Sequence, residues 1–239
     1  MHCPTIKVIY RELMVSKLLS VNSDAKTVKG QVHGYMTAIM YLEPDEMLCP
    51  HASKGCMEAC LKSSGRMPMA RPARLNRTEL WKSKREVFKY KLVEEITAFV
   101  KKAKRKGVKP TVRLNGTSDI VWEAVKFDKG KTIFELFPEV QFYDYTPNGY
   151  RFGRKLPSNY ALTYSLKEDN ESDAIRIANA GQNVAVVFRG DPPSKWKGRE
   201  VINGDEHDLR FLDKKGVIVG LKAKGKAMKD TTGFVQEVA

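Results

Sequence analysis

Short runs of apolar, β-branched and aromatic residues recur along the chain, separated by more polar segments. Each run has the length and composition of a buried strand. We predict strands over residues 34–42, 110–115, 140–145, 160–166, 183–189 and 216–221. Near the start, residues 6–10 also have strand-like composition, residues 12–19 are more helical, and the polar residues 22–30 indicate a turn.

Helical repeats of apolar positions lie between several of these strands. Residues 76–106 are predicted to form one long helix, because Val93, Ile96 and Val100 recur on one helical face. Gly107 ends this helix after a run of basic residues, which the helix dipole favours at that end. Shorter helices are predicted over residues 118–125, 132–137 and 172–180.

Strands that alternate with helices at this spacing predict an α/β fold with a mostly parallel sheet and crossover helices. About six strands are enough for a complete or truncated β/α barrel of the TIM type, and a doubly wound open sheet is the alternative. No linker or internal repeat divides the chain, so residues 1–239 are predicted to form a single barrel-like domain.

Three of the four cysteines, Cys49, Cys56 and Cys60, lie in one short loop after the strand at 34–42. Thiolates bind zinc and iron–sulfur clusters. If a helix begins near Cys56, then Cys56 and Cys60 share one of its faces, and His51 would complete a zinc site. Alternatively, the thiolates hold a four-iron cluster with one iron open to a ligand. The spacing is typical of neither kind of site, and buried free thiols are the third interpretation.

The charge of the chain adds a constraint on function. Lys and Arg total 42 against 28 for Asp and Glu, which gives a net charge of +14. Such an excess attracts nucleic acid, because neutralising phosphates releases counterions. No apolar run is long enough to span a membrane, and the opening residues lack the apolar core of a signal peptide. Together with clustered cysteines, these features predict a cytoplasmic protein that binds DNA.

Basic residues concentrate in two stretches of the chain. Pro68 and Pro72 argue against a regular helix after the cysteines, so the arginines there are predicted to lie in an exposed loop. Arginines suit bidentate contacts with phosphates. The residues predicted to contact phosphates are Arg66, Arg71 and Arg74 in this loop, and Lys222 and Lys224 after the last strand.

Polar side chains gather at the carboxyl ends of the predicted strands, where α/β enzymes place their active sites. They are Arg113, Asn115, Asp119, Tyr143, Asp144 and Tyr145. Asp119 and Asp144 could act as nucleophile and general acid or base, although Asp119 could instead cap the next helix. Tyr143 and Tyr145 offer flat surfaces on which a base could stack. The acids and histidine at 205–208 could bind a cation or form a plain acidic turn.

Several motifs occur together in this chain. They are Cys49-Pro50, Gly55-Cys56, Cys60, Gly65-Arg66, Asn115-Gly116 with Asp119, and Phe142-Tyr143 with Tyr145-Thr146. In this combination the chain resembles a widespread group of small, uncharacterised bacteriophage proteins, over roughly residues 35–150. Leu61 departs from that group, in which a tyrosine often follows the third cysteine.

In outline the chain is also similar to two better-understood barrel families. Guanine transglycosylases combine a barrel, a Cys/His zinc site and two aspartates, and phage versions exchange guanine in DNA for a 7-deazaguanine. Their zinc ligands lie late in the chain, unlike the cysteines here. Radical S-adenosylmethionine enzymes are partial barrels with a three-cysteine cluster loop after the first strand. The loop here shares that position, although no glycine-rich S-adenosylmethionine motif is evident.

The first of these similarities implies a phage enzyme that exchanges guanine in DNA for a 7-deazaguanine base. Asp144 and Asp119 would then be nucleophile and proton donor, in either order, while Arg113 and Asn115 hold the base. The cysteines would bind structural zinc, and the basic residues would grip phosphates. The alternatives are a radical enzyme with an iron–sulfur cluster and S-adenosylmethionine, and a non-enzymatic nucleic-acid-binding protein stabilised by zinc.

Overall fold

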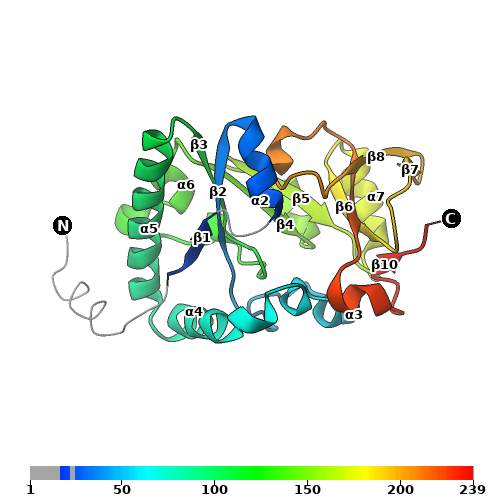
Figure 1. Ribbon diagram of the computed structural model, residues 1–239, viewed down its shortest axis with the longest axis horizontal. Helices are drawn as coiled ribbons and strands as arrows, with labels where there is room; N and C mark the ends of the chain where they lie inside the picture. The colour runs from blue at the N-terminus through cyan, green and yellow to red at the C-terminus, as the bar shows by residue number, and fades with distance from the viewer. Residues whose placement is uncertain (1–16, 22–24, 239) are drawn as a thin grey trace.

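The computed structural model describes residues 17–21 and 25–238 of the chain. The strand expected over residues 6–10, and most of the helical segment expected over residues 12–19, lie outside these residues. The fold is α/β, as predicted, and its centre is one mostly parallel sheet of 10 strands (Figure 1).

Six parallel strands stand side by side in the order in which the chain forms them. They are β2 (Tyr35–Met40), β3 (Lys109–Arg113), β4 (Gln141–Thr146), β5 (Tyr160–Ser165), β6 (Val184–Phe188) and β9 (Ile218–Lys222). Each corresponds to a predicted strand. An order without reversal is that of a β/α barrel, whereas a doubly wound sheet reverses its order at a switch point.

The remaining strands were not predicted, and they lie beside this group. β1 (Leu19–Val21) pairs antiparallel with β2, and β8 (Arg199–Asn203) pairs parallel with β9. β7 (Lys195–Trp196) is antiparallel to β8, and β10 (Val235–Gln236) adds to β6. Within the described residues the strand path runs from β1 to β7, and no pairing joins its ends. The structure therefore shows a mostly parallel α/β sheet that does not close within the described residues, and a truncated barrel stays a prediction.

One face of the sheet carries the main apolar core. The long helix α5 (Arg85–Arg105) packs here, with Phe88, Leu92 and Ile96 fully buried in the same cluster as Val112 of β3. Figure 1 shows α5 standing along one side of the sheet, with α4 (Arg71–Ser83) below it. The repeat that predicted this helix is therefore its buried face.

The opposite face of the sheet is polar at its centre. Side chains alternate along a strand, so the residues next to the core positions Val112 and Phe142 point away from that core. These residues are Thr111, Arg113 and Tyr143, and Tyr145, two positions after Tyr143, points the same way. The Thr111 hydroxyl donates to the Gln141 carbonyl of β4, and Asp208, from the segment between β8 and β9, is the partner of the other three side chains.

The helix prediction for residues 76–106 is corrected at two points. The helical region is divided into α4 and α5 at Lys84, where φ is −136°. Pro72 lies in the first turn of α4, where the missing N–H would have no partner in any case. The exclusion of a helix at Pro72 is therefore wrong. Among the described residues, no helix is both long enough and apolar enough to cross a membrane.

Shorter helices show mixed outcomes. α6 (Ile133–Leu136) and α7 (Glu171–Asn179) confirm two predictions, and α6 begins with a capping box formed by Thr132 and Glu135. The expected turn at 22–30 contains the helix α2 (Ala25–Lys29). Residues 118–125 contain only a short 3-10 turn, so the helix predicted there is wrong.

Candidate functional site

The cysteine loop crosses the carboxyl end of the parallel strands, directly after β2. It contains the short helix α3 (Lys54–Glu58), whose N-cap is Ser53. The Ser53 Oγ accepts a hydrogen bond from the backbone amide of Cys56 at 3.2 Å. Cys49 precedes α3, Cys56 lies within it, and Cys60 follows it. A helix is thus present at Cys56, but it ends at Glu58, so Cys56 and Cys60 do not share one helical face as expected.

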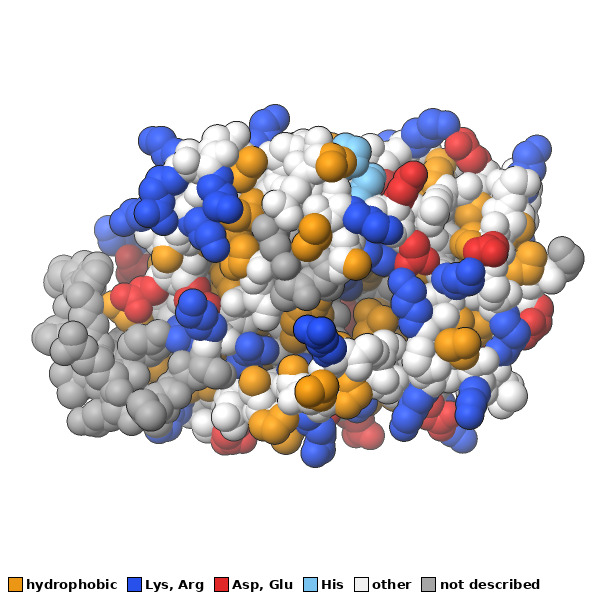
Figure 2. Space-filling model, viewed as in Figure 1, with side chains coloured by type: hydrophobic (Ala, Val, Ile, Leu, Met, Phe, Trp, Pro, Cys, Tyr) orange, Lys and Arg blue, Asp and Glu red, His pale blue; other side chains and the backbone are white. Residues whose placement is uncertain are grey.

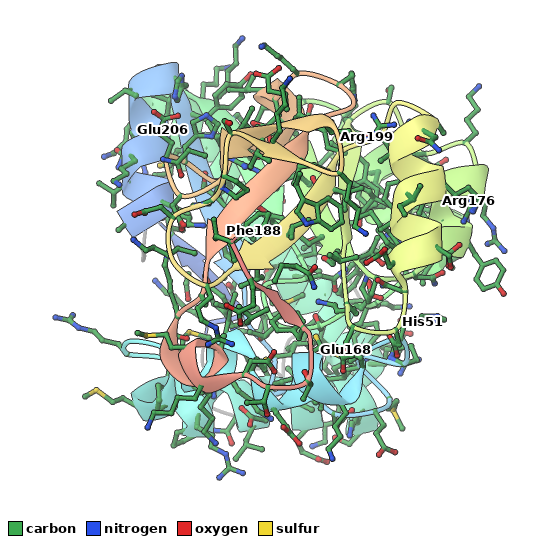
Figure 3. The ribbon with its side chains drawn as sticks, turned by 90° about the vertical axis from the view of Figure 1, so that its right-hand side faces the viewer. His51, Glu168, Arg176, Phe188, Arg199 and Glu206 are labelled. Carbon is green, nitrogen blue, oxygen red and sulfur yellow. The ribbon has the colours of Figure 1, made fainter. Side chains whose placement is uncertain are left out.

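Glu168, which follows β5, holds this loop in place. One oxygen of its carboxylate accepts a hydrogen bond from the Ser53 hydroxyl at 2.6 Å, and the other accepts one from the Gly55 amide at 2.6 Å. A Cβ atom at Gly55 would lie 2.9 Å from this carboxylate and would overlap the Thr232 hydroxyl. Glycine is therefore required for the close approach of α3 to the strand end. Figure 3 shows Glu168 and His51 together at this end of the sheet.

The three cysteines of the loop are free thiols, each partly exposed. Burial, together with the neighbouring Cys60, Asp119 and Cys56, raises the pKa of Cys49 to about 12. Burial also raises the pKa of Cys60. The thiols therefore lie within electrostatic reach of one another.

The predicted zinc site of Cys49, His51, Cys56 and Cys60 is not assembled. In the described part of the chain, no three His, Cys, Asp or Glu side chains are arranged to hold one metal ion. His51 is exposed rather than directed into a shared ligand sphere. A tetrahedral ion needs its ligands to converge on one point.

Asp119 brings a buried carboxylate to the same region. Asp119 lies in the segment after β3 and is 5% exposed. Its Oδ1 accepts a hydrogen bond from Arg151 at 3.2 Å. Its Oδ2 is buried and has no hydrogen-bond partner within the described residues. Burial raises the pKa of Asp119, while the charge of Arg151, an interaction with the Thr146 side chain and the charges of His51 and Lys167 oppose the shift. Among the residues that the structure describes, Oδ2 of Asp119 thus receives no hydrogen bond of ordinary geometry.

Lys167 is a site residue that the sequence analysis missed. It is 8% exposed, follows β5 directly, and forms no ion pair within the described residues. Its ammonium lies 4.7 Å from the centre of the Phe234 ring, and its charge acts on both Asp119 and Cys60. Its position after a predicted strand was the signal that could have identified it.

Asp144 does not have the access that a nucleophile requires. It is 1% exposed, and its Oδ1 accepts a hydrogen bond from the Asn115 amide at 2.7 Å. Its Oδ2 accepts from the Tyr160 hydroxyl at 2.9 Å. Burial raises the pKa of Asp144 to about 7, although these hydrogen bonds and the charges of Arg113 and Arg151 oppose the shift. The carboxylate therefore lies inside the protein with both oxygens hydrogen-bonded, which argues against attack on a sugar, and its catalytic role stays a prediction.

Asn115 serves the structure rather than a bound base. Its Oδ1 accepts hydrogen bonds from the Ser118 hydroxyl, the Ile120 amide and the Trp122 indole. Its Nδ2 donates to the Ile120 carbonyl at 2.9 Å. Side-chain bonds of this kind compete with helical hydrogen bonds, which explains why residues 118–125 form no regular helix. The predicted base-binding role of Asn115 is corrected on the same ground.

Asp208 is the hydrogen-bond acceptor for side chains on the polar face of the sheet. Its carboxylate accepts hydrogen bonds from Arg113 at 3.0 Å and from Tyr143 at 2.8 Å, and the Arg113 guanidinium lies 4.6 Å from the Tyr145 ring. Burial alone would raise the pKa of Asp208, but Arg113, Lys26 and Tyr143 outweigh it and lower the pKa. Tyr143 has 0% exposure, so its predicted role as a stacking surface is wrong. Arg113, which was predicted to hold a base, forms its ion pair with Asp208 instead.

Residues 16–238 match the model of the gene product 88 family. The chain belongs to this phage protein family. No curated protein and no solved structure matches it. The resemblance to a phage family is thus confirmed, over more of the chain than the motifs had indicated.

The residues predicted to contact phosphates differ in their exposure and in whether they form ion pairs. Arg74 is 1% exposed in α4, and it donates to Glu43 at 2.9 Å and to the Met67 carbonyl, so its predicted contact with phosphates is wrong. Arg66 and Arg71 are exposed, and Arg71 lies 3.5 Å from Glu43. The remaining two are exposed lysines that pair with acids: Lys222 with Asp191 at 2.7 Å, and Lys224 with Asp205 at 2.6 Å.

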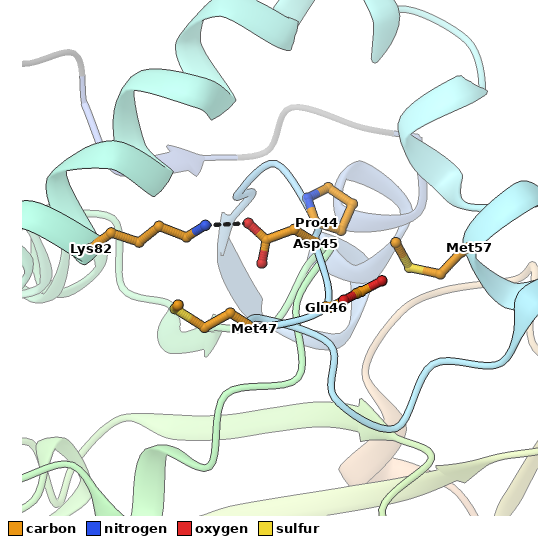
Figure 4. A pocket seen from close by; sticks show the side chains of 6 residues that line it. All are labelled: Pro44, Asp45, Glu46, Met47, Met57 and Lys82. Carbon is orange, nitrogen blue, oxygen red and sulfur yellow. Dashed lines mark hydrogen bonds and ion pairs between the residues drawn. The ribbon is translucent and has the colours of Figure 1, made fainter.

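A shallow pocket of about 480 Å³ adjoins the first part of the cysteine loop (Figure 4). It is lined by Pro44, Asp45, Glu46, Met47, Met57 and Lys82. Lys82 donates to Asp45 at 2.5 Å, as the dashed line in Figure 4 marks. This pair neutralises two of the charged groups at the pocket, and Glu46 is the other ionisable group in its lining.

Proposed function

We propose that this protein is an iron–sulfur enzyme of the radical S-adenosylmethionine type, with a four-iron cluster bound by Cys49, Cys56 and Cys60. The observation that carries the proposal is the place of the cysteine loop. The loop follows the first of six parallel strands that stand in chain order, and it lies at their carboxyl end. β/α barrels place their chemistry at this end.

The donor set is compatible with such a cluster. Cys thiolates are the usual cluster ligands, and each thiolate binds a different iron, so the three sulfurs do not have to converge on one point. The raised pKa values of Cys49 and Cys60 describe neutral thiols, and a bound cluster would replace their protons. Glu168 and Ser53 hold the loop without help from the cysteines.

Cys49, Cys56 and Cys60 would hold the cluster, which would supply the electron for reductive cleavage of S-adenosylmethionine. The chain's own residues supply binding groups. The free Oδ2 of Asp119 can accept a hydrogen bond from an N–H or O–H of a bound molecule. Lys167 presents a buried cation within electrostatic reach of both Asp119 and Cys60, where it would favour an anionic group.

Exchange of guanine for a 7-deazaguanine stays a prediction. Its two-aspartate mechanism requires both carboxylates to reach the reacting sugar and base. Asp144 is buried, and it is separated from Asp119 by Arg151 and Tyr160, which bridge the two. The position of the cysteine loop favours the radical enzyme over this alternative.

The test is anaerobic incubation of the reconstituted protein with S-adenosylmethionine and dithionite, with 5′-deoxyadenosine measured by mass spectrometry. We expect product from the wild type and from Cys3→Ser, whose cysteine lies outside the loop, and none from Cys56→Ser. A wild-type protein that contains the cluster and yields no product would overturn the proposal.

A further inference from the structure

Two basic segments from distant parts of the sequence meet beside the cysteine loop. The first is residues 61–71, and the second is the 3-10 segment η8 (Gly225–Lys229). Gly225 has φ of +59°, and a Cβ atom there would lie 3.2 Å from the Ser64 Cα. The absence of a side chain at Gly225 therefore lets η8 pack directly on the first segment.

The lysine segment η8 is held firmly in this position. Ala227 is buried in a small apolar cluster with Ala59 and Phe234, and Cys56 packs against the same cluster. Arg189, which follows β6, donates to the Met228 carbonyl at 2.6 Å and pairs with Glu237 at 2.6 Å. The charges that η8 carries are thus fixed next to the cysteines rather than placed on a loose tail.

The cations around the loop exceed the acids that neutralise them. Lys54, Arg66, Lys226 and Lys229 are exposed and form no ion pair within the described residues. Arg71 shares Glu43 with the buried Arg74, which takes the shorter contact. We call these five residues the basic rim. Figure 2 shows Lys and Arg side chains near the lower right edge of the molecule, over the segment that Figure 1 draws in red.

We infer that the basic rim binds the phosphate backbone of a nucleic acid, and that the substrate of the cysteine-loop site is a nucleotide of that strand. The inference rests on the proposed function for the chemistry at the loop, but the rim itself is independent of any cluster. Unpaired cations around one site attract a polyanion and orient it there. The net charge of +14 favours the same class of partner.

The experiment measures binding of fluorescein-labelled single-stranded DNA and RNA of one sequence by anisotropy, with the protein as purified and at several salt concentrations. Binding should weaken steeply with salt, with a slope of roughly −0.7 per phosphate contact. The double variant Lys226→Glu/Lys229→Glu should lose at least about tenfold in affinity. Comparison of the two strands identifies which nucleic acid is preferred.

The matched control is Lys101→Glu/Lys104→Glu on α5, which changes the net charge equally at exposed positions away from the rim. This control should change the affinity less than about threefold. Equal losses in both double variants, or equal competition by polyglutamate, would overturn the inference in favour of a general polyanion effect. Cleavage of S-adenosylmethionine without nucleic-acid binding would refute the inference alone, and binding without cleavage would refute the proposed function alone.

Discussion

The carboxylate of Glu168 lies 2.6 Å from the backbone nitrogen of Gly55 and so joins the end of β5 to the start of α3. This contact connects two segments that are far apart in the sequence and sets where the cysteine helix begins. Because the bond is made by a carboxylate and an amide, the loop has its shape before any thiol binds a ligand. The geometry of the site is therefore a property of the fold.

Gly55→Ala should disturb this arrangement, because the new Cβ would overlap the Thr232 hydroxyl and crowd the Glu168 carboxylate. We expect a loss of about 1–3 kcal/mol in the free energy of unfolding, together with weaker iron binding. Urea unfolding and iron analysis measure both. Gly153→Ala is the control, since nothing lies within 4 Å of a Cβ there. Equal behaviour of the two variants would refute the account of Gly55.

Arg74→Ala should lower the free energy of unfolding by about 3–5 kcal/mol, because it leaves Glu43 without its closest buried partner. Arg71→Ala removes the other arginine near Glu43, but that side chain is 63% exposed, so the change should stay within about 0.5 kcal/mol. Chemical denaturation of both variants tests this difference. Similar losses in the two would show that Arg74 is not the structural partner described.

Asp144 should make the protein less stable as the pH rises. Its pKa is about 7 in the fold against 3.8 in the unfolded chain, so the folded state binds one more proton between these values. Stability should then fall by about 1.4 kcal/mol per pH unit in this range. Asp144→Asn removes this dependence, so we expect the wild type to lose more stability than the variant between pH 5 and pH 7. Parallel pH profiles would contradict the assignment.

Asp119→Asn should impair the site without unfolding it. The substitution keeps the shape of the side chain but weakens it as an acceptor at the free Oδ2 position, and it removes the charge that faces Arg151. We expect S-adenosylmethionine cleavage to fall at least about tenfold, as for loss of one buried charged hydrogen bond, with iron content unchanged. Ser118→Ala, which alters a neighbouring hydroxyl, is the control. Full activity of Asp119→Asn would remove Asp119 from the site.

The six central strands could be predicted because each is a short run rich in β-branched, aromatic and other apolar residues, separated from the next by more polar segments. The two-residue strands β7 and β10 and the five-residue helices α2 and α3 carry too few positions to show a period. Pro72 was misleading because its effect depends on its place in the helix, which the sequence alone does not define.

The location of the candidate site could be predicted from the sequence, but the roles of its individual residues could not. The cysteine loop and Asp119 lie at the carboxyl end of the strands, as expected. The hydrogen bonds of Asp144 could not be predicted because its partner Tyr160 belongs to the next strand, and only tertiary structure brings the two together. Glu168 was overlooked for the same reason, since its role depends on Gly55.

The central claim is that Cys49, Cys56 and Cys60 hold an iron–sulfur cluster, and metal analysis of protein purified without oxygen tests it most directly. Iron, sulfide and zinc should be measured together with the visible spectrum. We expect about four irons and four sulfides per chain with a brown colour, and loss of both in Cys56→Ser but not in Cys3→Ser. One zinc per chain with no iron and no colour would contradict the claim.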